Sequence, residues 1–494
     1  MRERYSIPIF IFITLIIASV FIYITKNMDR KNSQLNNESQ IMAKDEYDWQ
    51  ESSKSALMQT IEEKIISKSE IKELLLAQIE ADEIGENRFE EEFLEADEEF
   101  QMREDGIAEL ENRILETEKK EIKKQKKQKD IQETSSVDDI DAHIEETKTD
   151  RQRVLEDENI PEWFKDGIRG LEYIKEQYGI DMGIAYRGVA QYEAVSENFA
   201  GGGNIDIFGR YQPSKSSTIG FNLRSRHTYG SYSSSQYAEN IGSLYAVSPS
   251  YEELPLFVTE LWYQYKLDSF TARLGFVNRN SFIDNSFYRN QNKYFLSSTF
   301  SLSPYNALPE NGLGLVLKYK KPKYYTIAYV ADSDAKKGES LGNALDRDIK
   351  LYSALEFGLT PEDAKYYVTL WNRDSSDVKK DKNRGAIFSA NKMFENNYKV
   401  FAKYAFSDSS IEKEHFEFGF GLKDIYREHD LISMAFSVSH PSKDLKTQST
   451  TEIFYRYNIY YGVQLTTSMQ VVNHPSKSEE TWALLPGVRV RMIF

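Results

Sequence analysis

The chain has 494 residues and a mean hydropathy of -0.58. This value excludes a bundle of membrane-spanning helices, because such a bundle needs several long apolar runs. It permits a membrane barrel, because the strands of a barrel are apolar on one face only. The absence of Cys excludes a disulfide scaffold, a thiolate metal site and a Cys nucleophile. The net charge of -16 is unevenly distributed: residues 1–30 carry +2, residues 31–150 carry -18 and residues 151–494 carry 0. No region that is expected to fold therefore has the basic excess of a nucleic-acid binder.

Residues 1–30 open with the basic stretch MRERYS and continue with an apolar run of 18 residues, 7–24. This length is at the lower limit for a membrane span, and it also fits the apolar part of an export signal. The best candidate for a small-residue cleavage site, Ile17-Ala18-Ser19, is poor. We therefore expect either a signal peptide that is removed or an uncleaved signal anchor.

Residues 31–159 form a polar, acidic segment with very little Gly or Pro. Between residues 89 and 114 its apolar residues occupy the a and d positions of a heptad: Phe89, Phe93, Ala96, Phe100, Ile107, Leu110 and Ile114. Two predictions stay open, a solvated helical or partly disordered spacer and a short coiled coil that joins copies of the chain in a homo-oligomer. In both cases we expect the segment to lie in the periplasm.

Residues 160–494 begin with a short amphipathic helix from Pro161 to Gly179, and a period of two residues follows it. We predict sixteen strands, many of which carry aromatic and β-branched residues at alternate positions. Every second connection is short, whereas two of the others, residues 229–256 and 279–311, are very long. This rhythm predicts an all-β transmembrane barrel of about 16 antiparallel strands with both barrel ends in the periplasm, and it disfavours a soluble β-sandwich.

One face of each strand is expected to meet lipid and the other the aqueous lumen. The residues predicted to line the pore are Glu260, Trp262, Gln264, Arg273, Glu452, Arg456, Asn458, Arg489 and Arg491. Mixed charges, amides and an aromatic ring suit a neutral, hydroxyl-rich solute, because hydroxyl groups both donate and accept and a ring packs against the C–H side of a sugar. A ring of one charge sign would instead suit an anion.

The connection of residues 279–311 is long enough to fold inward and narrow the barrel, and Arg279, Asp284 and Arg289 are its candidate constriction residues. On the fifth strand, the pattern places Leu274 and Phe276 on the lipid face, opposite Arg273. On the last strand, it places Val488, Val490, Met492 and Phe494 toward lipid and the two Arg residues toward the lumen. The terminal Phe494 resembles the signal that outer-membrane barrels present to the barrel-assembly machinery.

Four stretches resemble the carbohydrate-selective porin family of the OprB type. They are DGIRGLEYIKEQYGIDMGIAYRG, similar to the family's helix running into strand one; ARLGFVNRNSFIDNSFYRNQNKYFLSSTFSLSPYNALPENGLGLVLKY; FGFGLKDIYREHDLISMAFS, with Gly419, Gly421, Arg427 and Asp430; and TEIFYRYNIYYGVQLTTSMQVVNHPS, with Gln470, Asn473 and Pro475. The resemblance covers residues 160–494 and implies a passive outer-membrane channel that admits sugars. The long acidic segment and the poor cleavage site depart from the family pattern.

Motifs for catalysis are missing from the sequence. The six His residues do not have metal-ligand spacing, and neither a G-x-S-x-G elbow nor a P-loop occurs. A barrel hydrolase with Ser and His on its lipid-facing wall is the rival class. We predict a porin that is not an enzyme, without metal or cofactor, for sugars or other small hydrophilic solutes. The alternatives are a general or anion-selective porin and a structural tether formed by the N-terminal segment.

Overall fold

A computed structural model describes residues 140–494 except 157, 159, 347–349, 376–381, 395–397, 409–410, 428, 443–444 and 461. The apolar run of residues 7–24 and the heptad of residues 89–114 lie outside the described residues, so the interpretations of both stay predictions. Among the described residues there is no helix with both the length and the apolar content of a membrane span.

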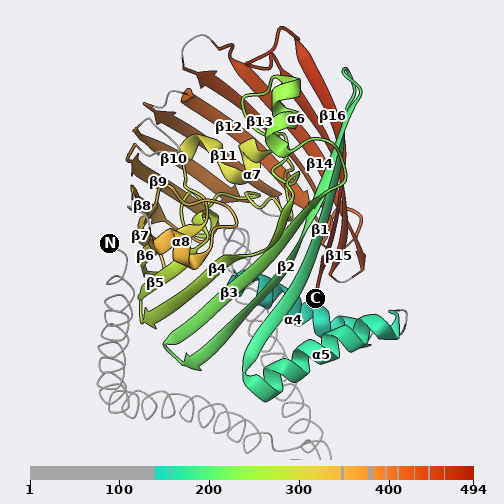
Figure 1. Cartoon of the computed structure of the whole chain (residues 1–494), viewed down its shortest axis with the longest axis vertical. Helices are drawn as coiled ribbons and strands as arrows, with labels where there is room; N and C mark the ends of the chain where they lie inside the picture. Colours follow the sequence, from blue (N-terminus) through green and yellow to red (C-terminus); the bar gives the residue numbers. More distant parts are fainter. Residues whose placement is uncertain are drawn as a thin grey trace, which may run out of the picture. The chain divides into compact units, whose positions relative to one another are not determined.

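Sixteen antiparallel strands form one closed barrel, in which β1 completes the ring by pairing with β16 (Figure 1). The strands are β1 (Ile180–Glu193), β2 (Asn198–Ser214), β3 (Ser217–Thr228), β4 (Leu254–Leu267), β5 (Phe270–Val277), β6 (Gly312–Lys320), β7 (Tyr324–Asp332), β8 (Leu351–Leu359), β9 (Ala364–Arg373), β10 (Asn383–Met393), β11 (Tyr398–Ser407), β12 (Glu412–Lys423), β13 (Leu431–Pro441), β14 (Gln448–Tyr460), β15 (Val463–Asn473) and β16 (Trp482–Ile493). The prediction of a barrel of about sixteen strands is confirmed.

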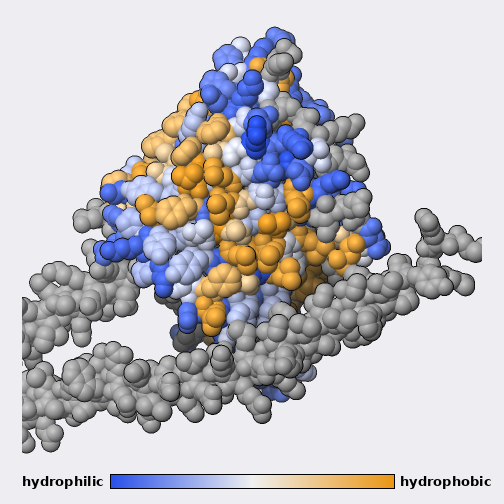
Figure 2. Space-filling model, turned by 90° about the vertical axis from the view of Figure 1, so that its left-hand side faces the viewer, coloured by the Kyte–Doolittle hydropathy of each residue, from blue (hydrophilic) through white to orange (hydrophobic). Residues whose placement is uncertain are grey.

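Side chains alternate between the two faces of the sheet, because successive residues of a strand point to opposite sides. In β16, Val488 is 39% exposed whereas its neighbour Arg489 is 1% exposed. In β8, Phe357 is exposed and Glu356 is buried. Figure 2 shows apolar side chains gathered over the middle of one outer face, with hydrophilic side chains toward its edges. The outer face of the barrel is therefore mainly apolar, whereas the interior holds buried charged and polar side chains together with apolar clusters.

One predicted lipid-facing residue of β5 is not exposed. Leu274 is 59% exposed, as the period of two predicts, but Phe276 is 4% exposed, so it does not meet lipid as predicted. The strand pairing stays regular there, with Phe276 opposite Leu261 of β4 and Leu313 of β6, and the next residue, Val277, is buried as an inward residue should be. Phe276 is therefore covered by other parts of the chain, although the alternation along β5 continues.

The connections differ in length at the two ends of the barrel. We call one end the short-turn end, because its connections are brief, such as residues 215–216 between β2 and β3 and residues 268–269 between β4 and β5. At the opposite, long-loop end, the described residues include helices in three connections: α6 (Ser234–Ile241) after β3, η1 (Arg279–Ser281), α7 (Ser298–Leu302) and η2 (Pro304–Asn306) after β5, and α8 (Leu341–Leu345) after β7. The predicted contrast between short and long connections is thus present.

Two helices, α4 (Ile140–Glu156) and α5 (Glu162–Tyr178), precede β1 at the short-turn end. Gly179 ends α5 with a φ of 68° and donates its N–H to the carbonyl of Lys175, as a helix C-cap requires, so the predicted helix is confirmed. Phe494 lies nearby, because its N–H donates to the carbonyl of Ile184 at 2.8 Å and its ring meets the ring of Phe164 edge-on, 4.5 Å between centroids. The end of the chain is therefore fixed between β1 and α5.

Asp430 organises the short turn between β12 and β13. Its carboxylate accepts hydrogen bonds from the N–H groups of Ile425, Tyr426 and Arg427 at 2.7, 3.1 and 3.3 Å and from the hydroxyl of Tyr455 at 2.8 Å. Burial acts to raise the pKa of Asp430, but the hydroxyl and the backbone amides outweigh it and lower this pKa below its ordinary value. The ionised form of Asp430 is therefore favoured by the fold.

Replacing Asp430 by Asn is expected to lower the free energy of unfolding by about 2 kcal/mol at neutral pH, because a charged acceptor of several hydrogen bonds is lost. The folded-state pKa lies below the unfolded-state pKa. The carboxylate's contribution is therefore complete above the unfolded-state pKa and is lost as the pH falls through the folded-state pKa. Urea unfolding of the wild type and Asp430→Asn, at neutral pH and at about pH 3, measures the difference in their free energies of unfolding. A difference that stays the same in acid would contradict this role.

Candidate functional site

The loop of residues 279–311 lies inside the barrel. Every residue from 279 to 311 is buried or half-buried, and Figure 1 shows α7 of this loop within the ring of strands. A loop that ran over the surface would expose most of its side chains. We call it the inner loop.

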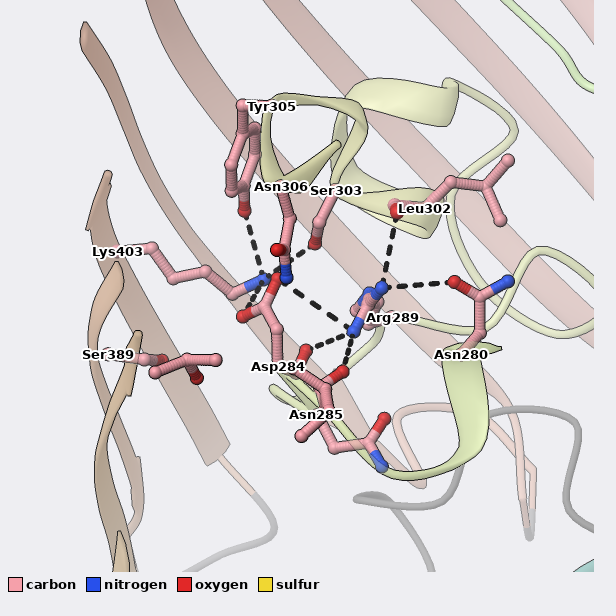
Figure 3. A network of polar contacts seen from close by, with 12 residues as sticks. Asn280, Asp284, Asn285, Arg289, Leu302, Ser303, Tyr305, Asn306, Ser389 and Lys403 are labelled. Carbon is pink, nitrogen blue, oxygen red and sulfur yellow. Dashed lines mark hydrogen bonds and ion pairs between the residues drawn. The ribbon is translucent and has the colours of Figure 1, made fainter. Parts of the chain in front are cut away.

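Asp284 is the centre of a buried network between the inner loop and the barrel wall (Figure 3). Its carboxylate lies 3.2 Å from Nζ of Lys403 in β11 and 3.8 Å from the guanidinium of Arg289, and it accepts a 2.8 Å hydrogen bond from the hydroxyl of Tyr367 in β9. Lys403 also lies 3.0 Å from the carboxylate of Glu417 in β12. The side chains of all four charged residues are fully buried, so water and salt screen these ion pairs very little.

Arg289 holds the inner loop in its own shape. Its guanidinium donates to the carbonyls of Ile283 and Leu302 at 2.6 and 3.1 Å and to the side-chain oxygen of Asn280 at 3.1 Å. Figure 3 shows Asn280 and Leu302 beside the guanidinium of Arg289. Asp284 adopts a positive φ of 57°, which is uncommon for a residue with a side chain. Arg289 therefore joins η1 and α7 of the inner loop to the irregular stretch between them.

Wall residues also bind the inner loop through its backbone. Glu356 in β8 accepts the N–H of Asp284 at 2.7 Å, and it accepts the hydroxyls of Tyr325 and Thr369 at 2.8 and 2.6 Å. The side-chain oxygen of Asn391 in β10 accepts the N–H of Phe287 at 2.8 Å. Buried backbone groups need such partners, so the wall satisfies a loop that is shielded from water.

A second set of wall residues binds the other half of the inner loop. Glu452 in β14 accepts the N–H groups of Leu296 and Ser297 at 2.8 and 2.9 Å. Arg489 in β16 donates to the carbonyls of Gln291 and Tyr294 at 3.0 and 2.6 Å. The inner loop is thus attached to the wall at two places, around Asp284 and around Glu452.

A neighbouring loop, residues 229–253 between β3 and β4, also turns inward with its second half. Its residues 241–251 are all buried or half-buried. Gln470 in β15 donates to the carbonyl of Val247 at 3.1 Å, and the hydroxyl of Tyr251 donates to Gln191 in β1 at 2.7 Å. Ser298 of the inner loop donates its N–H to the carbonyl of Ala246 at 3.2 Å. The two loops therefore contact each other as well as the wall.

On the wall that follows this loop, β4 and β5 carry an aromatic and charged patch. The indole N–H of Trp262 donates to Glu260 at 3.0 Å, and the guanidinium of Arg273 lies 3.6 Å from the centre of the Trp262 ring. Arg273 also donates to the side-chain oxygen of Gln264 at 3.0 Å. Gly220 lies directly opposite Trp262 in β3, and a Cβ there would collide with the indole, so Gly leaves the space that the ring occupies.

A polar cavity of about 50 Å³ is lined by residues of β3, β4, the inner loop and the connection after β7, toward the long-loop end. Its charged lining residues are Arg224, Arg226, Arg279, Glu310, Lys336, Lys337 and Glu339. Amide side chains of Asn278, Asn280, Gln291 and Asn311 complete the polar lining. Donors and acceptors are therefore mixed around one hollow, and the inner loop provides part of its wall.

Comparisons with known proteins bear on the fold. The high-pH structure of Pseudomonas putida OprB matches this chain with a TM-score of 0.56 at 12% identity, over 66% of this chain and 97% of that chain. The barrel has the OprB-type porin fold. The low-pH structure of the same protein matches with a TM-score of 0.45 at 12% identity, over 66% of this chain and 96% of that chain. A mutant of Rh. blastica porin matches with a TM-score of 0.41 at 12% identity, over 64% of this chain and 100% of that chain. No protein-family model and no curated protein matches the sequence.

Within this OprB-type barrel, the predicted pore-lining residues lie on the inner face. Glu260, Trp262, Arg273, Glu452, Arg456, Arg489 and Arg491 are buried, and Gln264 and Asn458 are half-buried. The predicted pore-lining residues of β4 and β5 meet in the patch around Trp262, whereas Glu452, Arg456 and Arg489 lie around the inner loop. Arg456 donates to the carbonyl of Lys293 at 3.4 Å. That they line a conducting path stays a prediction.

The three predicted constriction residues are divided between two places. Asp284 and Arg289 meet in the buried network, but Arg279 lies at the start of the inner loop, where it donates to the carbonyl of Pro309 at 2.8 Å and lies 3.4 Å from Glu310. Spacing along the loop could not separate these positions, because the loop has no period.

Several wall residues that hold the inner loop in this OprB-type barrel were not among the residues predicted from the sequence, above all Glu356, Lys403 and Glu417. A signal for them exists, because the period of two places each on the inner face of its strand: LYSALEFGL for Glu356, YKVFAKYAFS for Lys403 and EKEHFEFGFGLK for Glu417. The loop atom that each one meets depends on the path of the loop and cannot be found from the strand alone.

Proposed function

We propose that the protein is an outer-membrane porin through which small hydrophilic solutes, with a preference for sugars, diffuse passively. The observation that carries this proposal is the contrast between an apolar outer face and a polar interior that holds an anchored loop. An apolar outer belt suits lipid, and a polar interior suits water-soluble cargo. A loop fixed inside the barrel restricts what passes through it.

The preference for sugars is supported by the chemistry of the polar cavity. Its lining combines cations such as Arg224 and Lys337 with the carboxylates of Glu310 and Glu339 and with amides. A hydroxyl group can donate to a carboxylate or amide oxygen and accept from a guanidinium, so a neutral solute rich in hydroxyls matches this mixture. The resemblance of residues 160–494 to carbohydrate-selective porins agrees with the same cargo.

Liposome swelling tests this function. We expect liposomes that contain the full-length protein to swell faster in isotonic monosaccharide or disaccharide than in amino acids of similar size. Swelling that does not exceed that of empty liposomes would refute the porin function. Swelling that follows solute size alone would leave a general porin and refute the preference for sugars.

An anion-selective porin is the second candidate, and the Arg residues of the interior favour it. Arg187 in β1 lies directly opposite Arg491 in β16, with Arg489 two residues from it. Two Arg side chains that face each other across neighbouring strands repel each other unless an anion lies near them. Single-channel reversal potentials in a salt gradient distinguish the candidates: a sugar-preferring pore gives weak ion selectivity, and an anion pore gives a strong anion preference.

The proposal includes the parts of the chain outside the barrel. Residues 1–30 would serve as a signal peptide or signal anchor, residues 31–159 as a periplasmic segment and residues 160–494 as the porin domain. If the apolar segment is kept, residues 31–159 would tether the barrel to the inner membrane. N-terminal sequencing of the mature protein tests this, because a start beyond residue 24 removes the anchor.

Deleting Phe494 is expected to reduce the amount of folded barrel in the outer membrane, with less effect on transport by the barrels that do assemble. The deletion removes the last backbone pairing with Ile184 and the ring contact with Phe164, and with them the proposed signal to the assembly machinery. Quantification of the folded, heat-modifiable band in membrane fractions measures the effect. A conservative Phe494→Tyr variant serves as the control. Equal membrane levels after the deletion would contradict the assembly role.

A further inference from the structure

The helix α4 presents one face to the inside of the barrel at the short-turn end. Its buried residues recur at the spacing of one helix face: Ile140, His143, Ile144, Thr147, Arg151 and Val154. Figure 1 shows α4 at the same end of the barrel as α5 and the C-terminus. This helix is distinct from the inner loop, which enters from the long-loop end.

Apolar contacts place the first half of α4 against the inner wall. Ile140 and Ile144 are fully buried, and they belong to the same apolar cluster as Phe208 of β2 and Trp262 of β4, which both lie on inner faces. The ring of His143 lies 5.3 Å from the ring of Phe208. A helix on the outside of the barrel could not reach these inner-face residues. The start of α4 therefore lies within the mouth of the barrel.

Polar contacts fasten α4 to the rim of the mouth. Arg151 donates to the terminal carbonyl of Phe494 at 3.1 Å and to the carboxylate of Glu172 in α5 at 3.0 Å. Glu145 accepts a 2.8 Å hydrogen bond from Arg210, which lies at the end of β2. The helix is thus attached to strands on both sides of the β1–β16 seam by a few separate contacts.

The stability of α4 depends on this docking. Its 17 residues, IDAHIEETKTDRQRVLE, are mostly polar and would be marginal as an isolated helix in water. Each ion pair that holds α4 contributes little free energy, because Glu145, Lys148 and Glu172 are partly exposed to solvent. The chain also continues for 139 residues before α4, so a force or partner acting on that segment acts directly on the helix.

We propose that α4 is an intramolecular plug, which narrows the periplasmic mouth of the pore when it is docked and widens the mouth when it leaves. This rests on the proposed porin function. A solute that has passed the inner loop would have to pass α4 before it enters the periplasm. Release of α4 would raise conductance without any change at the inner loop.

Planar-bilayer recordings of the full-length protein test the plug. In an Ile140→Asp, Ile144→Asp variant, two carboxylates would have to be buried among apolar side chains, which is costly, so α4 should undock. We expect a several-fold higher single-channel conductance than in the wild type. Glu156→Gln changes the charge at an exposed end of the same helix and should leave the conductance unchanged. The heat-modifiable band verifies that each barrel is folded.

A cysteine pair supplies the opposite test, since the chain has no Cys of its own. A His143→Cys, Phe208→Cys variant joined by a short bifunctional thiol cross-linker, with the cross-link verified by mass spectrometry, should conduct less than the same variant before cross-linking, because the link keeps α4 docked. Equal conductance of a folded Asp variant and the wild type, or of the cysteine variant before and after verified cross-linking, would overturn the plug while leaving the porin function intact. No conductance in any protein, the wild type included, would overturn the porin function and the plug with it.

Discussion

Replacing Asp284 by Ala is expected to release the inner loop from the barrel wall, to raise the single-channel conductance and to lower the free energy of unfolding by about 4 kcal/mol. The carboxylate of Asp284 lies between Lys403 and Arg289, and all three side chains are fully buried. Removing it leaves two cations near each other without the anion between them. Planar-bilayer recordings measure the conductance, and urea unfolding in lipid vesicles measures the stability.

The control for Asp284→Ala is Asp408→Ala. Asp408 pairs with Arg384 at 2.9 Å, but these side chains are 46% and 78% exposed, so their ion pair contributes little. Asp408→Ala should therefore match the wild type in both measurements. If Asp284→Ala also matches the wild type in conductance while the barrel stays folded, the inner loop is not held by this network.

Replacing Glu452 by Ala is expected to release the other half of the inner loop and to lower the free energy of unfolding by about 3 kcal/mol. Glu452 is the acceptor for the N–H groups of Leu296 and Ser297 and for the hydroxyl of Ser468 at 2.7 Å. Alanine leaves these donors buried without the carboxylate. The same urea unfolding and bilayer recordings measure the outcome, and we expect noisier and larger current steps than in the wild type.

Glu414→Ala removes a carboxylate from an exposed position of β12 and is the matched control for Glu452→Ala. Combining Asp284→Ala with Glu452→Ala is also informative. Because both residues hold one loop, the second substitution should raise the conductance by less than it does alone. Effects on conductance that simply add would show that the two attachments act on separate parts of the pore.

The barrel itself could be predicted from the sequence, because a closed sheet imposes a strict pattern. Alternation places Arg489 inside and Val488 outside, and the lengths of the connections give the number of strands and the two ends. The pattern does not predict exposure by itself, because Phe276 lies opposite the exposed Leu261 and is nevertheless 4% exposed. The period of two gives the face of a strand, whereas tertiary packing decides what covers that face.

The candidate site could be predicted only in part. The length of residues 279–311 indicated a loop that folds inward, but the pairing of Asp284 with Lys403 joins residues more than a hundred positions apart through a loop without a period. Loop 229–253 gave no signal of its own that its second half turns inward. Long-range partners of irregular loops are set by tertiary packing, which strand patterns do not encode.

We propose that the inner loop, held at Asp284 and Glu452, gives the pore its preference for sugars. The most direct test is the ratio of liposome swelling rates in a sugar and in an amino acid of similar size, measured for the wild type and for Asp284→Ala. We predict a ratio well above that of an unselective pore in the wild type and a fall to the value set by size alone in Asp284→Ala. The same ratio in both proteins, with the variant folded, would contradict the claim.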